Sequence, residues 1–175
     1  DILLNEGIML TSEKSDADTR INISVLENDG KTLEINAPGS PIGNTKEKIE
    51  EKILSEVSAG DVVVIAGSCP GDVSKSYPSC LVKKLKELGV ITVLDCDGEA
   101  LRIALDSDVK PDVIKPNAAE LSGFSGMKVS DFDSARSAAE KTGVKTVITT
   151  LAGDGAVLTE EGTSTFFNVN KVRPV

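Results

Sequence analysis

Between about residue 45 and residue 160, apolar runs typical of strands alternate with amphipathic stretches typical of helices. In the amphipathic stretches apolar side chains recur every three or four residues, as Ile49, Ile53 and Val57 do, which places them on one face of a helix. The apolar run at 61–68 is rich in Val, as in a strand buried on both faces. The pattern predicts helices at 44–57, 74–89, 97–105 and 130–143, another helix after residue 117, and strands at 61–68, 90–95, 113–114, 145–150 and 156–159. The helix at 130–143 is expected to open with a capping box of Ser130 and Asp133.

Alternating strands and helices of this size predict an α/β fold with a doubly wound, mostly parallel sheet covered by helices on both faces. In such sheets ligands bind beyond the carboxyl ends of the strands. We therefore expect the chemistry of the protein at four strand ends, which lie at 67–71, 95–97, 115–117 and 150–153.

The segment at 19–36 has a different period. Ile21, Ile23 and Val25 alternate with polar residues, and a second strand-like segment follows an Asn-Asp-Gly turn at 28–30. This predicts a β-hairpin with one dry and one wet face. Because a hairpin does not belong in a doubly wound parallel sheet, we expect a separate β-lid at 16–38 and an α/β core made of 1–15 and 39–175.

Composition narrows the ligand class. The 175 residues carry a formal net charge of −9, and no basic stripe is visible, which argues against nucleic acid as a partner. A small phosphorylated ligand is compatible with this charge, since it needs only one or two cations and some backbone N–H groups. No run is long and apolar enough to cross a membrane, so we expect no membrane partner.

The chain has three cysteines and no histidine. Cys69, Cys80 and Cys96 form no C-x-x-C pair, so neither a zinc site nor a disulfide framework is expected, and a reducing, cytoplasmic setting fits. Without histidine, nucleophilic mechanisms of the Ser-His-Asp or Cys-His kind are excluded.

Single motifs each allow two interpretations. Lys115 follows the strand at 113–114, where it could meet a phosphate or simply be solvated. Asn117 and Glu120 fit an N-x-x-E capping box, and Glu120 could also serve a magnesium-bound phosphate. The two roles are compatible with one another.

Other candidate segments have equally simple structural explanations. The glycines of GSCPGD at 67–72 could let the backbone approach an anion or could form an ordinary strand–helix turn. LAGDG at 151–155 matches no phosphate-binding pattern, and Asp154 is expected to be a turn residue. Arg20 could clamp a phosphate or lie on the surface of its strand.

The combination is more specific than its parts. The chain resembles the ribokinase-like sugar kinases of the phosphofructokinase B group in the order and spacing of five segments: TRINISV, GDVVVIAGSCPGD, TVLDCDGEAL, VIKPNAAEL and VITTLAGDGAVL. Within that group it is similar to 1-phosphofructokinases and, next, to tagatose-6-phosphate kinases. The resemblance implies a phosphotransferase with an alcohol acceptor that uses ATP and Mg²⁺ to convert fructose 1-phosphate to fructose 1,6-bisphosphate, or acts on tagatose 6-phosphate.

The resemblance also implies residue roles on the sugar side. Arg20 would reach from the β-lid to the sugar phosphate, and Gly67 and Ser68 would line the phosphosugar pocket. Because the family hairpin is a lid and often a dimer interface, a homodimer through the β-lid is expected.

On the nucleotide side, the resemblance places Lys115 and Asn117 along the ATP phosphates, and Glu120 near the magnesium and its waters. The nucleotide loop would use Thr150, Ala152, Gly153 and Gly155. Ala152 stands where many relatives have glycine.

Two family features have no counterpart in the sequence. These are the N-terminal strand with a sugar-binding aspartate, and the C-terminal G-A-G-D motif whose aspartate is the general base. We therefore expect a core that is incomplete at both ends, no catalytic base within the chain, and no sugar phosphorylation by these 175 residues alone. Two other interpretations stay open: a non-catalytic nucleotide-binding or assembly module, and a doubly wound protein with no phosphate ligand.

Overall fold

The computed structural model describes residues 2–26, 32–96 and 98–169, and the chain divides into two compact units. The first unit consists of Asp1–Glu56 and Cys69–Ser74. The second consists of Val57–Ser68 and Lys75–Val175. The chain therefore crosses between the units three times. Two of these crossings lie at the ends of Cys69–Ser74, in the loop that follows the first strand of the large sheet.

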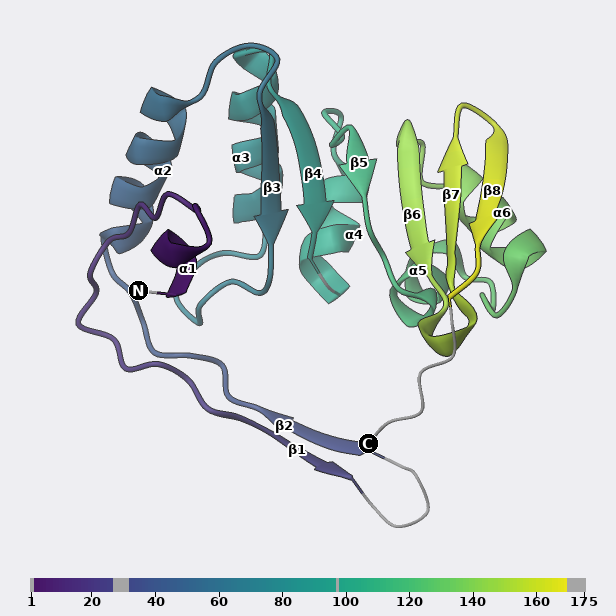
Figure 1. Ribbon diagram of the computed structural model, residues 1–175, viewed down its shortest axis with the longest axis horizontal. Helices are drawn as coiled ribbons and strands as arrows, with labels where there is room; N and C mark the ends of the chain where they lie inside the picture. The colour runs from purple at the N-terminus through teal and green to yellow at the C-terminus, as the bar shows by residue number, and fades with distance from the viewer. Residues whose placement is uncertain (1, 27–31, 97, 170–175) are drawn as a thin grey trace. The chain divides into compact units, whose positions relative to one another are not determined.

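The second unit contains a six-stranded sheet with its strands in sequence order (Figure 1). Its strands are β3 (Val62–Ala66), β4 (Ile91–Asp95), β5 (Val113–Ile114), β6 (Thr146–Thr150), β7 (Ala156–Glu160) and β8 (Thr163–Phe167). The pairings from β3 to β6 are parallel, and β6–β7 and β7–β8 are antiparallel. The α/β class with a mostly parallel sheet is confirmed, whereas strand β8 is missing from the sequence prediction.

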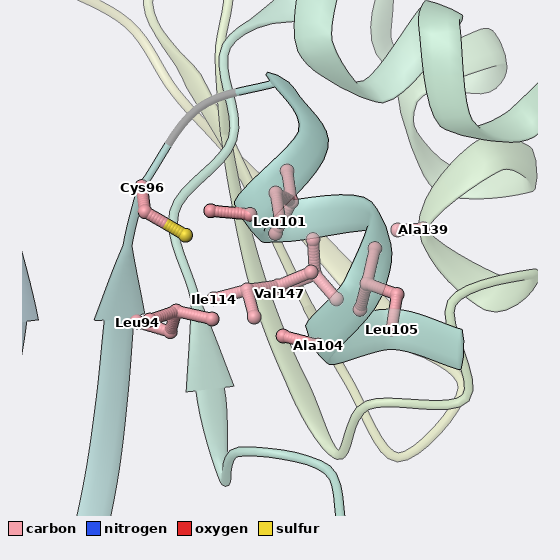
Figure 2. Packing of buried hydrophobic residues seen from close by; sticks show 9 residues of the cluster. Leu94, Cys96, Leu101, Ala104, Leu105, Ile114, Ala139 and Val147 are labelled. Atoms are coloured by element: carbon pink, nitrogen blue, oxygen red, sulfur yellow. The ribbon is translucent and has the colours of Figure 1, made fainter. Parts of the chain in front are cut away.

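Four helices accompany this sheet: α3 (Tyr77–Glu87), α4 (Gly98–Asp106), α5 (Ala118–Ser125) and α6 (Phe132–Glu140). The larger hydrophobic cluster joins α4 to three neighbouring strands (Figure 2). Leu94, Ile114 and Val147 are register partners, so they lie on the same face of the sheet. They pack against Leu101 and Leu105 of α4, and all five side chains are at most 3% exposed. This burial fixes the strand ends from which the candidate site is built.

Strand β3 is not buried as predicted. Val62 and Val64 are 60% and 59% exposed, so the expectation of a strand covered on both faces is wrong. Val63 and Ile65 point to the other face, because their register partners Thr92 and Leu94 are fully buried. The apolar run correctly indicates a strand, but burial depends on neighbours from elsewhere in the fold, and β3 forms the edge of this sheet.

The helix ends show how local sequence sets the boundaries. Helix α3 stops before Gly89, which has a φ of 75° and permits the Val90 N–H to bond the Leu85 carbonyl at 3.1 Å. Helix α6 starts with a capping box of Asp131 and Ser134. The predicted box of Ser130 and Asp133 was therefore wrong by one residue, because both pairs have the same spacing and polar character.

The first unit contains α1 (Ile2–Asn5), α2 (Thr45–Glu56) and an antiparallel hairpin of β1 (Asn22–Leu26) and β2 (Thr32–Asn36). The predicted hairpin is confirmed, and its turn at 28–30 lies outside the described residues. The expected dry face is not found. The apolar pairs Ile23–Ile35 and Val25–Leu33 are between 45% and 54% exposed, because a two-stranded ribbon buries side chains only against another element.

Within the described ranges, no helix combines the length and the hydrophobicity that crossing a membrane requires.

Candidate functional site

Three predicted site residues meet at the carboxyl edge of the sheet. The Lys115 N–H donates to the Leu94 carbonyl at 3.1 Å, which fixes the end of β5 beside the end of β4. The Thr150 N–H donates to the Pro116 carbonyl at 3.0 Å, and Asn117 and Thr150 form a parallel β-bridge. Lys115, Asn117 and Thr150 are thus brought together from segments more than 30 residues apart in the sequence. The edge of a parallel sheet where strands end is the usual ligand position in this fold class.

Lys115 is paired with a carboxylate. Its Nζ lies 3.1 Å from Oδ2 of Asp95, and the two side chains are 43% and 37% exposed. An ion pair this open to water contributes only about 0–1 kcal/mol to stability, so an incoming anion can replace the carboxylate. Asp95 was recognised in the sequence as part of a strand end, but its pairing with Lys115 was missed because the two are 20 residues apart.

Asn117 and Glu120 form the predicted capping box. Oδ1 of Asn117 accepts from the Glu120 N–H at 2.9 Å, and Oε2 of Glu120 accepts from the Asn117 N–H at 2.7 Å. Among the described residues, no hydrogen bond reaches Oε1 of Glu120. This oxygen fits a Mg²⁺ ion that arrives with a nucleotide, because Mg²⁺ keeps several waters and takes few protein ligands. No group of three or more acidic or thiol side chains that could hold a metal by itself occurs among those residues.

The loop after β6 begins with a strained residue. Ala152 has a φ of 51°, in the left-handed region, and Leu151 before it has a φ of −111° and a ψ of 37°. Because Leu151 lies outside the αR region, the pair is not the αR–αL nest known from other anion sites. Residues Ala152–Asp154 form a single 3₁₀ turn, so the N–H groups of Ala152 and Gly153 have no carbonyl within the turn to bond.

The two glycines of this loop differ in their surroundings. A Cβ added at Gly155 would lie 2.1 Å from the carbonyl oxygen of Phe167, and the φ of Gly155 is 119°. At Gly153 a Cβ would meet nothing within 4 Å. Gly155 is therefore required by the packing of β8 against the loop, whereas Gly153 leaves space through which a ligand could approach.

Two neighbouring cavities open at this edge. One, of about 530 Å³, is lined by Asn117, Ala118, Ala119, Ser130, Thr150, Leu151 and Ala152. The other, of about 580 Å³, is lined by Gly98, Glu99, Leu101, Arg102, Ala119, Glu120, Gly123 and Phe124. Both volumes are in the range of small-molecule sites. Three predicted nucleotide residues share the first cavity, and the predicted metal residue lines the second. Ser130 was missed as a lining residue, since the sequence offered it only as a helix cap.

The predicted sugar-side residues fall in different units. Arg20 belongs to the first unit, where its Cδ lies 3.9 Å from the position of a Cβ added at Gly39. Gly67 and Ser68 belong to the second unit, where the Gly67 N–H donates to the Asp95 carbonyl at 3.0 Å. A Cβ added at Gly67 would meet nothing within 4 Å, and its φ is 90°, so the residue both makes the turn and leaves room beside it.

Fold and site together define an α/β protein with an anion-compatible edge, and comparison with known proteins assigns its family. The model of the pfkB family carbohydrate kinases matches residues 2–175. The chain therefore belongs to the pfkB family of carbohydrate kinases. The resemblance stated from the sequence segments is confirmed.

Individual relatives agree with this assignment. The chain is 31% identical over 172 residues to the 1-phosphofructokinase of Bacillus subtilis, covering 97% of this chain and 55% of that protein. It is 33% identical over 148 residues to the tagatose-6-phosphate kinase of Staphylococcus epidermidis, covering 82% of this chain and 47% of that protein. The crystal structure of phosphofructokinase-2 from Escherichia coli in complex with fructose-6-phosphate matches with a TM-score of 0.81 at 25% identity, over 98% of this chain and 58% of that one. The chain thus spans about half the length of the relatives it matches.

Proposed function

We propose that these residues serve an ATP-dependent, Mg²⁺-dependent kinase of a ketohexose monophosphate, which converts fructose 1-phosphate to fructose 1,6-bisphosphate. The observation that carries the proposal is the convergence of Lys115, Asn117 and Thr150 at one sheet edge of a pfkB-family chain. The names of two relatives support a phosphorylated ketohexose as the substrate class and leave tagatose 6-phosphate as the alternative.

Each residue has a role in the proposed reaction. Lys115 exchanges Asp95 for a nucleotide phosphate, and the N–H groups of Ala152 and Gly153 bind phosphate oxygens. Glu120 would hold the Mg²⁺ that arrives with the nucleotide, while its Oε2 keeps the hydrogen bond of the helix cap. When bound, the metal neutralises charge that develops on the transferred phosphoryl group.

On the sugar side, Arg20 binds the phosphate already present on the substrate, and Gly67 and Ser68 line its pocket. Catalysis of this kind is mainly positioning and electrostatic stabilisation. No described residue is assigned as the base that removes the hydroxyl proton.

We also propose that residues 16–38, which contain the hairpin, form a lid and an interface to a second copy of this chain. The support is its apolar face, in which Ile23, Val25, Leu33 and Ile35 remain about half exposed. Pairing two such faces would bury them, as the hydrophobic effect favours. Size-exclusion chromatography with light scattering should report a dimer that Ile23→Asp disrupts.

Isothermal titration tests the nucleotide part of the proposal. The chain should bind MgATP, and Lys115→Glu should weaken this binding by at least about tenfold, since charge reversal replaces attraction by repulsion. Lys145→Glu is the matched control, because Lys145 is an exposed lysine paired with Glu161 at the start of β6. Equal MgATP affinities for the wild type and Lys115→Glu would contradict the proposed phosphate site.

The coupling between the two ligands separates the kinase from the second candidate, a nucleotide-binding or assembly module without chemistry. That candidate is favoured by the absence of an assigned base among the described residues. Because no turnover is expected of these 175 residues alone, the measurement is the affinity for MgATP with and without a sugar phosphate. An MgATP affinity that changes in the presence of fructose 1-phosphate or tagatose 6-phosphate supports the kinase, and an affinity that neither sugar phosphate changes supports the binding module.

A further inference from the structure

The loop after β3 leaves the unit in which it starts. Gly67 and Ser68 belong to the second unit, but the next six residues, Cys69–Ser74, belong to the first unit together with the hairpin. The boundary is the peptide bond between Ser68 and Cys69. The contacts of Cys69–Ser74 are therefore described within the first unit, which also contains Arg20.

The side chain of Asp72 binds this segment to the backbone before α2. Oδ2 of Asp72 accepts hydrogen bonds from the N–H groups of Ile42 and Gly43, both at 2.9 Å. Ile42 and Gly43 lie between the hairpin and α2. Bonds from these two N–H groups lower the pKa of Asp72 below its ordinary value, so the carboxylate is charged at neutral pH. Charge-assisted bonds to backbone N–H groups are among the stronger hydrogen bonds of proteins.

The surrounding backbone is closely packed around the same point. A Cβ at Gly71 would lie 3.4 Å from the Gly39 carbonyl oxygen. A Cβ at Gly39 would lie 3.9 Å from Cδ of Arg20 and 4.0 Å from Cα of Pro70. The stem of Arg20 and the segment clamped by Asp72 are therefore neighbours within the first unit.

We propose that Asp72 is a positioning residue for the sugar phosphate. By fixing Cys69–Ser74 beside the stem of Arg20, Asp72 holds the arginine in the position from which it binds the sugar phosphate. The inference rests on the proposed function, because it assumes that Arg20 contacts the phosphorylated sugar. A small displacement of a positioned group is enough to reduce binding strongly.

Two substitutions separate the hydrogen bonds from the charge and size of the side chain. Both bonds end on one oxygen, so Asp72→Asn retains an acceptor, whereas Asp72→Leu keeps a similar size without one. The matched control is Asp61→Leu, which removes a carboxylate that accepts a backbone N–H, that of Ser58 at 2.8 Å, at the other end of β3.

The experiment measures affinities of the 175-residue chain for fructose 1-phosphate, tagatose 6-phosphate and MgATP by titration calorimetry, with amide hydrogen exchange at Ile42 and Gly43. Asp72→Leu should lose amide protection at both residues and about tenfold in sugar phosphate affinity, with MgATP affinity unchanged. Asp72→Asn should stay within about threefold of the wild type, and Asp61→Leu should match the wild type in binding.

The outcomes are distinct. Unchanged sugar phosphate affinity in Asp72→Leu would overturn the inference alone, as would an equal loss of sugar phosphate and MgATP affinity, which indicates a general structural role. A folded wild-type chain that binds neither sugar phosphate would overturn the proposed sugar site and this inference with it.

Discussion

The two ends of strands β4 and β5 use the same residue types in different ways. At the amino end, Lys86 lies 2.5 Å from Oδ1 of Asp112, whose Oδ2 accepts from both the N–H and the hydroxyl of Thr92 at 2.9 Å. At the carboxyl end, Lys115 lies 3.1 Å from Asp95. Among the described residues, Asp95 makes no other side-chain hydrogen bond. The first pair is part of a network, and the second pair is an isolated contact.

A second lysine at the amino end, Lys110, also has partners within the fold. Nζ of Lys110 donates to the carbonyl of Leu105 near the end of α4 and, at 2.9 Å, to that of Thr142 just after α6. Cations suit such positions because helix ends leave carbonyl groups unbonded. The comparison indicates that charge at the amino edge stabilises the fold, while charge at the carboxyl edge remains exchangeable for a ligand.

The largest effect is expected inside the carboxyl-edge loop, where one glycine is structural. Gly155→Ala should lower the free energy of unfolding by about 3 kcal/mol, because its Cβ would overlap the Phe167 carbonyl and its φ is positive. Gly153→Ala should change it by less than about 1 kcal/mol, since the added methyl meets open space. Urea denaturation of both variants checks this, and equal losses would show that the loop is not divided into structural and open positions.

The next largest difference in stability is expected between substitutions of Asp112 and Asp95. Asp112→Ala should lower the free energy of unfolding by about 2 kcal/mol, because it leaves Thr92 and Lys86 without their charged partner. Asp95→Ala should lower it by less than about 1 kcal/mol, as for other exposed pairs. A comparable loss in both variants, measured by the same denaturation, would remove the distinction between the two edges.

The pH dependence provides an independent check of the amino-edge network. Burial alone would raise the pKa of Asp112, but hydrogen bonds from Lys86 and Thr92 outweigh it and lower the pKa. The stabilisation is therefore complete above the ordinary aspartate pKa of about 3.9 and is lost as the pH falls through the lower, folded-state pKa. In acid titrations of stability, Asp112→Asn should show a shallower decline below about pH 4 than the wild type does.

Lys115 and Lys86 should differ in whether their substitution affects MgATP binding or stability. Lys115→Met should weaken MgATP binding by about tenfold, equivalent to about 1.4 kcal/mol, with little change in stability. Lys86→Met should leave MgATP affinity unchanged and reduce stability instead, because Lys86 belongs to the Asp112 network. Calorimetry and denaturation of both variants provide the four values, and an exchange of the two phenotypes would refute the assignment of the edges.

Substitutions of Thr149 and Thr92 should change the free energy of unfolding by smaller amounts and in opposite directions. The hydroxyl of Thr149 is fully buried and, among the described residues, has no hydrogen-bond partner. Thr149→Val should therefore raise the free energy of unfolding by about 1 kcal/mol. Thr92→Val should lower it, because the hydroxyl of Thr92 bonds Asp112. A loss of stability in Thr149→Val would indicate a partner for that hydroxyl.

The smallest effect concerns the strain at Ala152. Its left-handed conformation costs about 1–2 kcal/mol in a residue other than glycine, while glycine loses about 0.5–1 kcal/mol through unfolded-state entropy. Ala152→Gly should therefore raise the free energy of unfolding by about 0.5 kcal/mol, which appears as a slightly higher melting temperature. A lower melting temperature would show that the surrounding turn, rather than Ala152, sets this conformation.

Much of the fold follows from local sequence. The period of apolar residues predicted helices α2, α3, α4 and α6 and strands β3, β4, β6 and β7 within a few residues of their ends. Strand β8 was missed because TSTFF at 163–167 lacks a clear period. The candidate site was predicted as a set of strand ends, and the order of parallel strands then brought Lys115, Asn117 and Thr150 together.

The sequence by itself determined the alternation of strands and helices, the hairpin, the Asn117–Glu120 cap and the family, because these depend on residues close together in the chain or on their order. Only the tertiary structure decided which strand faces are buried, that Asp95 pairs with Lys115, and that Gly155 is held against Phe167. These features depend on contacts between residues distant in sequence, whose free energies exist only once the chain is folded.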